Sequence, residues 1–288
     1  MMTVRDLLRE IIARLETAGV SEPRPGAALL LSAVLKIERG RLPLVYPDPV
    51  DERQIELARA WTARRCRHEP VQYILGTWEF AGRPVQVGPG VLVPRPETEE
   101  WLDRLSELLA STLPAGRRWN FADIGTGTGV IGLTLAARFQ DSGGWLIDIS
   151  PDALSWTQKN IASSSDAADR ISLLRGDLTT PLRSGSLELL VSNPPYVDQV
   201  DMPGLMPDVR DWEPSLALDG GLDGLDVFRR LLGDACRVLK PGGLFAAEHG
   251  HGQRKMLLNL PAPGLELVET IDDMAGLERC IIWRKRYI

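Results

Sequence analysis

The sequence is poor in the residues that build disulfide frameworks and metal centres. Its 288 residues include three cysteines, Cys66, Cys236 and Cys280, and three histidines. Three cysteines far apart in sequence favour neither a disulfide framework nor a zinc site, so we expect reduced core thiols in a cytosolic protein. His249 and His251 lack further Cys or His partners. We therefore expect a turn at a strand end there, and no metal.

Excess positive charge and long apolar runs are also missing. The formal net charge is -6 and the pI is ≈ 5.3, which argues against a nonspecific grip on nucleic acid. No apolar run could span a bilayer, and the N-terminus lacks a signal cleavage site. We expect a cytoplasmic protein that binds neither membrane nor nucleic acid. One basic cluster, at 64–68, is interpreted as a solvated helix end that complements the helix dipole.

The beginning of the chain has the apolar spacing of a small helical bundle. Thr3 and Asp51 are suited to cap helices, and Pro25 suits the first turn of another. Residues 76–95 change to the alternation of strands, with a turn expected at 82–84, which predicts a β-hairpin. We therefore expect a helical domain at 1–75, a hairpin linker at 76–95 and a larger domain at 96–288.

The larger domain alternates strands with helices. One late helix is expected at 223–238. Strands are expected at 119–124, 145–147, 171–174, 187–191, 244–247, 265–268 and 280–284. This alternation predicts an α/β fold, a Rossmann-like parallel sheet with helices on both faces. Ligands of such sheets bind beyond the carboxyl ends of the strands. Gly125, Asp148, Asp177 and Asn193 follow four of these strands, so we expect them at one edge, where all four can contact a bound cofactor.

The turn after the first of these strands is rich in glycine and predicts a nucleotide-type cofactor site. Its residues are Gly125, Thr126, Gly127, Thr128 and Gly129. Glycines there let a ligand approach backbone N–H groups at a helix start. Asp123 can hold a ligand amine, and Asp148 can accept two ribose hydroxyls. The run Gly127 to Gly132 also matches the dinucleotide fingerprint of nicotinamide enzymes, but Asp123 and the loop described next favour S-adenosylmethionine over NAD.

A second chemical motif, Asn193-Pro194-Pro195-Tyr196, follows the apolar strand at 187–191. The Asn side-chain oxygen and the Pro194 carbonyl can each accept one N–H bond from a planar amide or aromatic amine. Two such acceptors favour a pyramidal nitrogen and stabilise the charge that grows on it during transfer. Tyr196 offers a flat surface for the planar group. The alternative is an ordinary proline-rich turn after a strand.

These motifs together resemble the bacterial peptide-chain release factor glutamine methyltransferases. The resemblance rests on the Asn-Pro-Pro-Tyr loop, the Gly-Thr-Gly-Thr-Gly turn and the run Val91 to Glu99, and further matches are Glu213-Pro214, Ala217-Leu218 with Gly220-Gly221, and Glu248-His249-Gly250. It implies a class I methyltransferase fold and methyl transfer from S-adenosylmethionine to the glutamine of a Gly-Gly-Gln motif in release factors. It also implies that the helical domain helps recognise this protein substrate.

The resemblance assigns one further role, two other segments suggest roles of their own, and two rival functions remain. It places Asp177 and Leu178 at the edge of the adenine pocket. The stiff Pro94-Arg95-Pro96 segment can bring Arg95 to the mouth of the site as a substrate-binding residue, or can serve only as a linker. Residues 198–221 suggest a lid or binding loop.

The rival functions are an adenine-specific DNA methyltransferase, which shares the tetrapeptide but needs a basic groove, and a catalytically silent cofactor-binding module.

Overall fold

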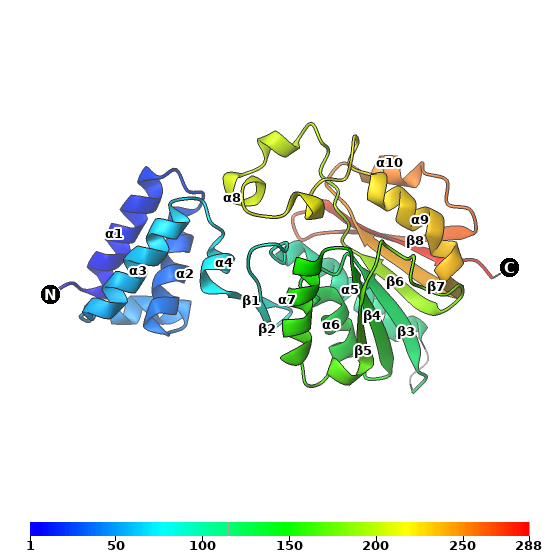
Figure 1. Cartoon of the computed structure of the whole chain (residues 1–288), viewed down its shortest axis with the longest axis horizontal. Coiled ribbons are helices and arrows are strands. Elements are labelled where there is room, and N and C mark those ends of the chain that lie inside the picture. Colours follow the sequence, from blue (N-terminus) through cyan, green and yellow to red (C-terminus); the bar gives the residue numbers. More distant parts are fainter. Residues whose placement is uncertain (114–115, 288) are drawn as a thin grey trace. The chain divides into compact units, whose positions relative to one another are not determined.

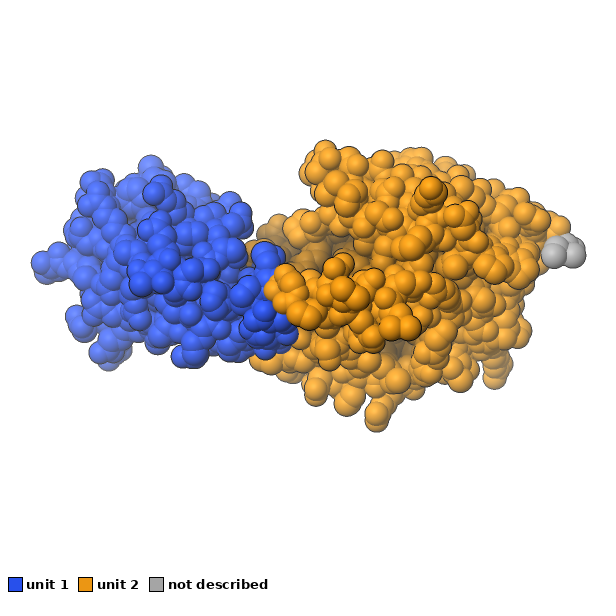
Figure 2. Space-filling model, turned by 90° about the horizontal axis from the view of Figure 1, so that it is seen from above, with its two compact units in different colours: residues 1–77, 206–212 blue, residues 78–205, 213–288 orange. Residues whose placement is uncertain are grey.

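The computed structural model describes residues 1–113 and 116–287. They form two compact units, shown in two colours in Figure 2. The helical unit comprises Met1–Thr77 and Met206–Trp212, and the sheet unit comprises Trp78–Leu205 and Glu213–Ile288. This grouping differs from the division expected from the sequence in two ways. The hairpin belongs to the sheet unit, and a segment from late in the chain joins the helical unit.

The helical unit has its own apolar core. Its helices are α1 (Val4–Thr17), α2 (Pro23–Leu35), α3 (Glu52–Arg65) and α4 (Val71–Leu75), with a 3-10 helix at Arg39–Val45. Thr3 and Asp51 cap α1 and α3 through capping boxes, as the sequence predicts. Leucine, isoleucine and valine side chains one helical turn apart form the core, including Leu7, Ile11 and Leu15 of α1.

Short helix α8 (Pro207–Arg210) belongs to this unit through contacts with the end of α3. The Arg65 guanidinium donates to the Asp208 carboxylate at 3.1 Å, and the Trp212 indole N–H donates to the Arg67 carbonyl at 3.1 Å. The Arg65 side chain is 7% exposed. The prediction that the basic cluster is a solvated helix end is therefore wrong for Arg65, whose charge is paired and buried.

The sheet unit begins with the predicted hairpin. Strands β1 (Thr77–Phe80) and β2 (Arg83–Gln86) pair as a two-stranded sheet. The turn lies at Ala81 and Gly82, both at positive φ, so the expected turn at 82–84 is displaced toward the N-terminus. Such left-handed pairs match the twist of a two-residue hairpin.

A seven-stranded sheet forms the centre of this unit (Figure 1), in the order β5-β4-β3-β6-β7-β9-β8. Its strands are β3 (Trp119–Ile124), β4 (Ser142–Asp148), β5 (Ile171–Arg175), β6 (Leu187–Ser192), β7 (Leu239–Glu248), β8 (Leu265–Asp272) and β9 (Glu278–Lys285). The first five in that order are parallel, and β9 is antiparallel to both of its neighbours. The predicted α/β fold is confirmed.

Helices cover both faces of the sheet because its strands are apolar on both sides. One face packs on α5 (Pro96–Thr112), α6 (Val130–Arg138) and α7 (Pro151–Ala162). The other packs on α9 (Asp226–Val238) and α10 (Arg254–Leu258). Phe121 and Ala122, neighbours in β3, bury their side chains on opposite faces. This crossover arrangement brings the carboxyl ends of β3 to β6 to one edge.

Several details differ from the expectations. Strands β4 and β7 begin earlier, and α9 begins at Asp226. The loop at 198–221 contains 3-10 helices at Met202–Gly204 and Ser215–Ala217 as well as α8. All three cysteines are free, but only Cys280 is buried, so the prediction of core thiols is correct for Cys280 alone. Within the described residues, no helix has the length and apolar character needed to cross a membrane.

Candidate active site

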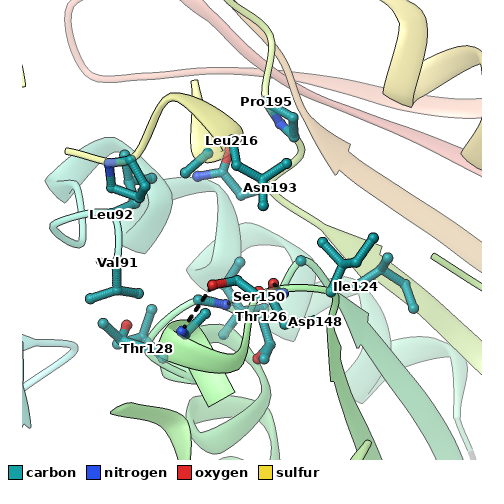
Figure 3. Close-up of a pocket in the computed structure, with 18 of the residues that line it drawn as sticks. Val91, Leu92, Ile124, Thr126, Thr128, Asp148, Ser150, Asn193, Pro195 and Leu216 are labelled. Atoms are coloured by element: carbon teal, nitrogen blue, oxygen red, sulfur yellow. Dashed lines mark hydrogen bonds between the residues drawn. The ribbon is translucent and has the colours of Figure 1, made fainter. Parts of the chain in front are cut away.

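A cavity of about 220 Å³ opens at the carboxyl ends of the parallel strands. Gly125, Asp148, Asp177 and Asn193, which follow β3, β4, β5 and β6, all line it, as the strand order predicts. Figure 3 shows Asn193 and Pro195 on one side of this cavity and Asp148 with Thr126 on the opposite side. The site therefore has one wall from the glycine-rich turn and another from the Asn-Pro-Pro-Tyr loop.

The glycine-rich turn has a backbone that side chains would strain. Gly125, Gly127 and Gly129 have φ values of +66°, +59° and +87°. A Cβ on Gly129 would also lie 2.9 Å from the Thr157 methyl group. Helix α6 begins directly after Gly129 without a side-chain cap, and its first residues line the cavity. The turn and the positive end of the helix dipole suit a ligand that carries a negative group.

Asp123 lies behind this turn and does not line the cavity. Its Oδ2 accepts hydrogen bonds from the Thr126 hydroxyl at 2.6 Å and the Gly132 N–H at 3.0 Å, which fixes the turn. Its buried Oδ1 has no hydrogen-bond partner among the residues that the structure describes. Burial raises the pKa of Asp123 to about 6, because these hydrogen bonds offset only part of the cost of burying the charge. Contact between Asp123 and a ligand amine stays a prediction.

Asp148 faces the cavity from the end of β4. Its Oδ2 accepts from the Gly127 N–H at 3.0 Å and its Oδ1 from the Ser150 N–H at 2.9 Å, the bonds drawn in Figure 3. Burial raises the pKa of Asp148, and these backbone bonds oppose the rise. Each oxygen keeps a second lone pair, so the carboxylate can also accept two hydroxyl groups. The partly exposed side chain of Ile149 adds an apolar wall beside it.

Asp177 and Leu178 line the cavity after β5. The Asp177 carboxylate accepts a hydrogen bond from the Arg230 guanidinium at 2.6 Å. Leu178 has a φ of +50°, a left-handed conformation that is rare for a residue with a branched side chain. Arg230 lines the same part of the cavity and was not anticipated from the sequence.

The Asn-Pro-Pro-Tyr loop is held at both ends. The Ser192 hydroxyl donates to the Ile124 carbonyl at 2.8 Å, and the Gln253 side chain donates to the Tyr196 carbonyl at 2.8 Å. The Asn193 amide nitrogen donates to the Thr98 hydroxyl oxygen at 3.3 Å. Among the described residues, none donates a hydrogen bond to the Asn193 side-chain oxygen. That oxygen is therefore an acceptor available to a bound molecule.

The four residues of this loop differ in burial and in whether they line the cavity. Asn193 and Pro195 line the cavity, whereas Pro194 is buried and Tyr196 is half-buried beside it. The Tyr196 hydroxyl lies 3.5 Å from the Glu248 carboxylate. Burial and this nearby acid raise the pKa of Tyr196 above its ordinary value. The predicted packing of Tyr196 against a substrate stays a prediction.

Arg95 lines the cavity, which agrees with the first of the two roles that the sequence left open for it. Its guanidinium donates to both carboxylate oxygens of Glu213, at 2.8 and 2.6 Å. The Glu213 side chain is 1% exposed, so this ion pair is anchored in the protein. It ties the start of α5 to the far end of the loop that follows Tyr196.

Several lining residues were missed from the sequence. Val91, Leu92 and Thr98 come from the segment around the start of α5, and Leu216 from the loop after Tyr196. Val91, Leu92 and Thr98 lie in the run used for the family resemblance, which was the signal that could have identified them. Leu216 has no such signal, because an apolar residue in an irregular loop predicts no particular contact.

Family models and known proteins match this chain over most of its length. A family model described as the PrmC N-terminal domain matches residues 6–76, and one described as the methyltransferase small domain matches residues 98–205. A release factor glutamine methyltransferase of Nitratidesulfovibrio vulgaris is 40% identical over 99% of this chain and 96% of that protein. One from Moorella thermoacetica is 40% identical over 99% of each. The chain belongs to the release factor glutamine methyltransferase family.

The fold agrees with this family. A methyltransferase structure from Pyrococcus furiosus matches 72% of this chain and 91% of its own with a TM-score of 0.51, at 18% sequence identity. As a family member the chain is a methyltransferase that uses S-adenosylmethionine, and the site fits that cofactor. Asp148 offers paired acceptors for a ribose, and the glycine turn lets a ligand reach backbone N–H groups. The buried Oδ1 of Asp123 accepts no hydrogen bond from the described part of the chain, so this carboxylate oxygen can still accept one from a ligand.

Proposed function

We propose that this protein transfers the methyl group of S-adenosylmethionine to the side-chain amide nitrogen of the glutamine in the Gly-Gly-Gln motif of peptide-chain release factors. The family supports this reading, because its members across bacteria bear the name release factor glutamine methyltransferase. The single observation that carries the chemistry is the orientation of Asn193. Its NH2 group is engaged by Thr98, and its oxygen is left to accept a hydrogen bond at the cavity.

An amide nitrogen is a poor nucleophile because its lone pair is delocalised into the carbonyl. In our proposal the Asn193 oxygen and the Pro194 carbonyl each accept one N–H of the substrate glutamine. They orient the nitrogen and stabilise the positive charge that develops on it. Tyr196 packs against the planar amide, and Pro195 and Arg95 complete the substrate side of the site. A methylated amide cation is a strong acid and can lose its proton to water, so the proposal needs no dedicated base.

The cofactor lies on the opposite wall in this proposal. Its ribose binds to Asp148, its amino acid part to the glycine turn and Asp123, and its adenine between Asp177 and Leu178. When bound, S-adenosylmethionine would supply an electrophilic methyl group, and breaking its S–CH3 bond would leave S-adenosylhomocysteine as the product. No metal takes part in this scheme. The protein partner is the release factor, and we place the reaction in the cytoplasm without contact to nucleic acid or membrane.

The test is incubation of the protein with labelled S-adenosylmethionine and a purified release factor, followed by mass spectrometry of the product. We expect one methyl group on the glutamine of the Gly-Gly-Gln motif. A release factor with this glutamine changed to alanine is the matched control and should take no label. Duplex DNA in a parallel reaction tests the rival adenine methyltransferase. Label on DNA, or none on any substrate despite cofactor binding, would refute the proposal.

Asn193→Ala should lower kcat by about 100- to 1,000-fold, which is the usual cost of losing one preorganised hydrogen-bonding group. Cofactor affinity should change little, because Asn193 lies on the wall opposite Asp148 (Figure 3). Single-turnover rates and cofactor titrations separate the two effects. A rate within tenfold of wild type would remove Asn193 from the mechanism.

A further inference from the structure

Two buried residues outside the Asn-Pro-Pro-Tyr loop are hydrogen-bonded in series to Asn193. Glu248 ends β7 and is 1% exposed, and Thr98 lies in the first turn of α5 and is 2% exposed. The Glu248 Oε2 accepts from the Thr98 hydroxyl at 2.6 Å and from the Trp101 indole N–H at 2.6 Å. The Thr98 oxygen in turn lies 3.3 Å from the Asn193 amide nitrogen.

The direction of each hydrogen bond follows from chemistry. An indole N–H can only donate, so the Glu248 Oε2 accepts from Trp101, and it also accepts from Thr98 when the acid is ionised or carries its proton on Oε1. A hydroxyl has one hydrogen, and the Thr98 hydroxyl uses it on that same oxygen, at the shorter of its two contacts. The Thr98 oxygen can then only accept. The Asn193 side chain must therefore present its NH2 group to Thr98 and its carbonyl oxygen to the other side.

We propose that Thr98 and Glu248 are positioning residues that set the amide orientation of Asn193, so that its oxygen and not its NH2 group meets the substrate amide. This inference rests on the proposed function. An Asn side chain has nearly the same shape in both orientations, so shape alone does not select one. With its amide reversed, Asn193 would present donors to the donors of the substrate glutamine, and the acceptor would be lost.

Thr98→Val tests this series, because valine has nearly the same shape as threonine but has no hydroxyl. We expect kcat for release factor methylation to fall at least tenfold while the Kd of S-adenosylmethionine changes less than twofold. Thr98→Ser restores the hydroxyl and should recover most of the rate. Thr134→Val is the matched control, since Thr134 is also buried on a helix of the sheet unit but does not line the cavity. Its rate should equal that of wild type.

The decisive measurement is the double variant. If Thr98 acts only through Asn193, then Thr98→Val should have no further effect on kcat in an Asn193→Ala background. A merely structural role would lower the rate further in that background. The inference is overturned if Thr98→Val keeps the wild-type rate, or if its effect is unchanged when Asn193 is alanine.

A second readout needs no methyl transfer. In nitrogen-15 NMR spectra, the side-chain NH2 signals of Asn193, assigned by their loss in Asn193→Ala, should shift in Thr98→Val and return in Thr98→Ser. Unchanged signals in Thr98→Val would overturn the inference, even for a protein whose wild type did not modify release factors. An inactive wild type would refute the proposed function, so the two failures are distinguishable.

Discussion

The buried carboxylate of Asp123 should make the cofactor-free protein less stable as the pH rises through the acid range. Its pKa is raised from 3.8 to about 6, mainly by burial. In the unfolded chain this carboxyl loses its proton near its ordinary pKa, whereas the folded protein retains the proton up to about pH 6. The unfolded state is therefore favoured progressively between these two values. At about 1.4 kcal/mol per pH unit, the loss amounts to about 3 kcal/mol by pH 7.

Asp123→Asn removes this titration and keeps an oxygen for the Thr126 and Gly132 donors. Its NH2 group takes the place of the buried Oδ1, at a cost that does not depend on pH. We therefore expect the difference in free energy of unfolding, variant minus wild type, to rise by about 2.4 kcal/mol between pH 4 and pH 7. The difference isolates Asp123 from the other buried acids, Asp148 and Glu248, whose pKa values are also raised by burial.

The assay is urea unfolding without cofactor at several pH values, followed by tryptophan fluorescence. Asp169→Asn, at an exposed position of the same unit, is the matched control and should run parallel to wild type. If Asp123→Asn also runs parallel to wild type across this range, the argument from burial is refuted. If Asp123 binds the cofactor amine as proposed, the same variant should also bind S-adenosylmethionine more weakly in calorimetry.

Two further predictions concern the cofactor wall and the helical unit. Asp148→Asn should weaken S-adenosylmethionine binding at least tenfold in calorimetry, because an amide offers one acceptor oxygen where the carboxylate offers two; an unchanged Kd would contradict the ribose assignment. Arg65→Met should lower the free energy of unfolding of the helical unit by about 3 kcal/mol, since it leaves Asp208 without its partner. Arg41→Met breaks an exposed ion pair and should have no measurable effect; equal losses would refute the argument.

The general fold could be predicted because it depends on regular patterns. Helix caps at Thr3 and Asp51, the period-two hairpin and the alternation of strands with helices each depend on residues close together in sequence. The convergence of Asp148 and Asn193 on one edge also followed, because parallel strands end on the same side of a sheet. Local periodicity was therefore sufficient to place the four strand-end residues around one cavity.

Contacts between distant segments could not be predicted in this way. The membership of 206–212 in the helical unit depends on Arg65 and Asp208, which are 143 positions apart and belong to no repeating pattern. The basic cluster therefore looked like a solvated surface, although Arg65 is paired and buried. Strand ends were also missed where glycine and proline occur within the strand, as in Lys240 to Gly243 of β7.

The series from Glu248 through Thr98 to Asn193 shows why the remaining part of the site lay beyond the sequence. Glu248 and Thr98 are 150 positions apart, and each alone is an ordinary polar residue. Only the packing of α5 against the sheet brings them together and excludes water from both. With water excluded, the single hydroxyl proton of Thr98 is donated to the Glu248 carboxylate. The Thr98 oxygen can then only accept, so the Asn193 amide must donate to it. The tetrapeptide supplies the asparagine, but the orientation on which its chemistry depends comes from a helix and a strand elsewhere in the chain.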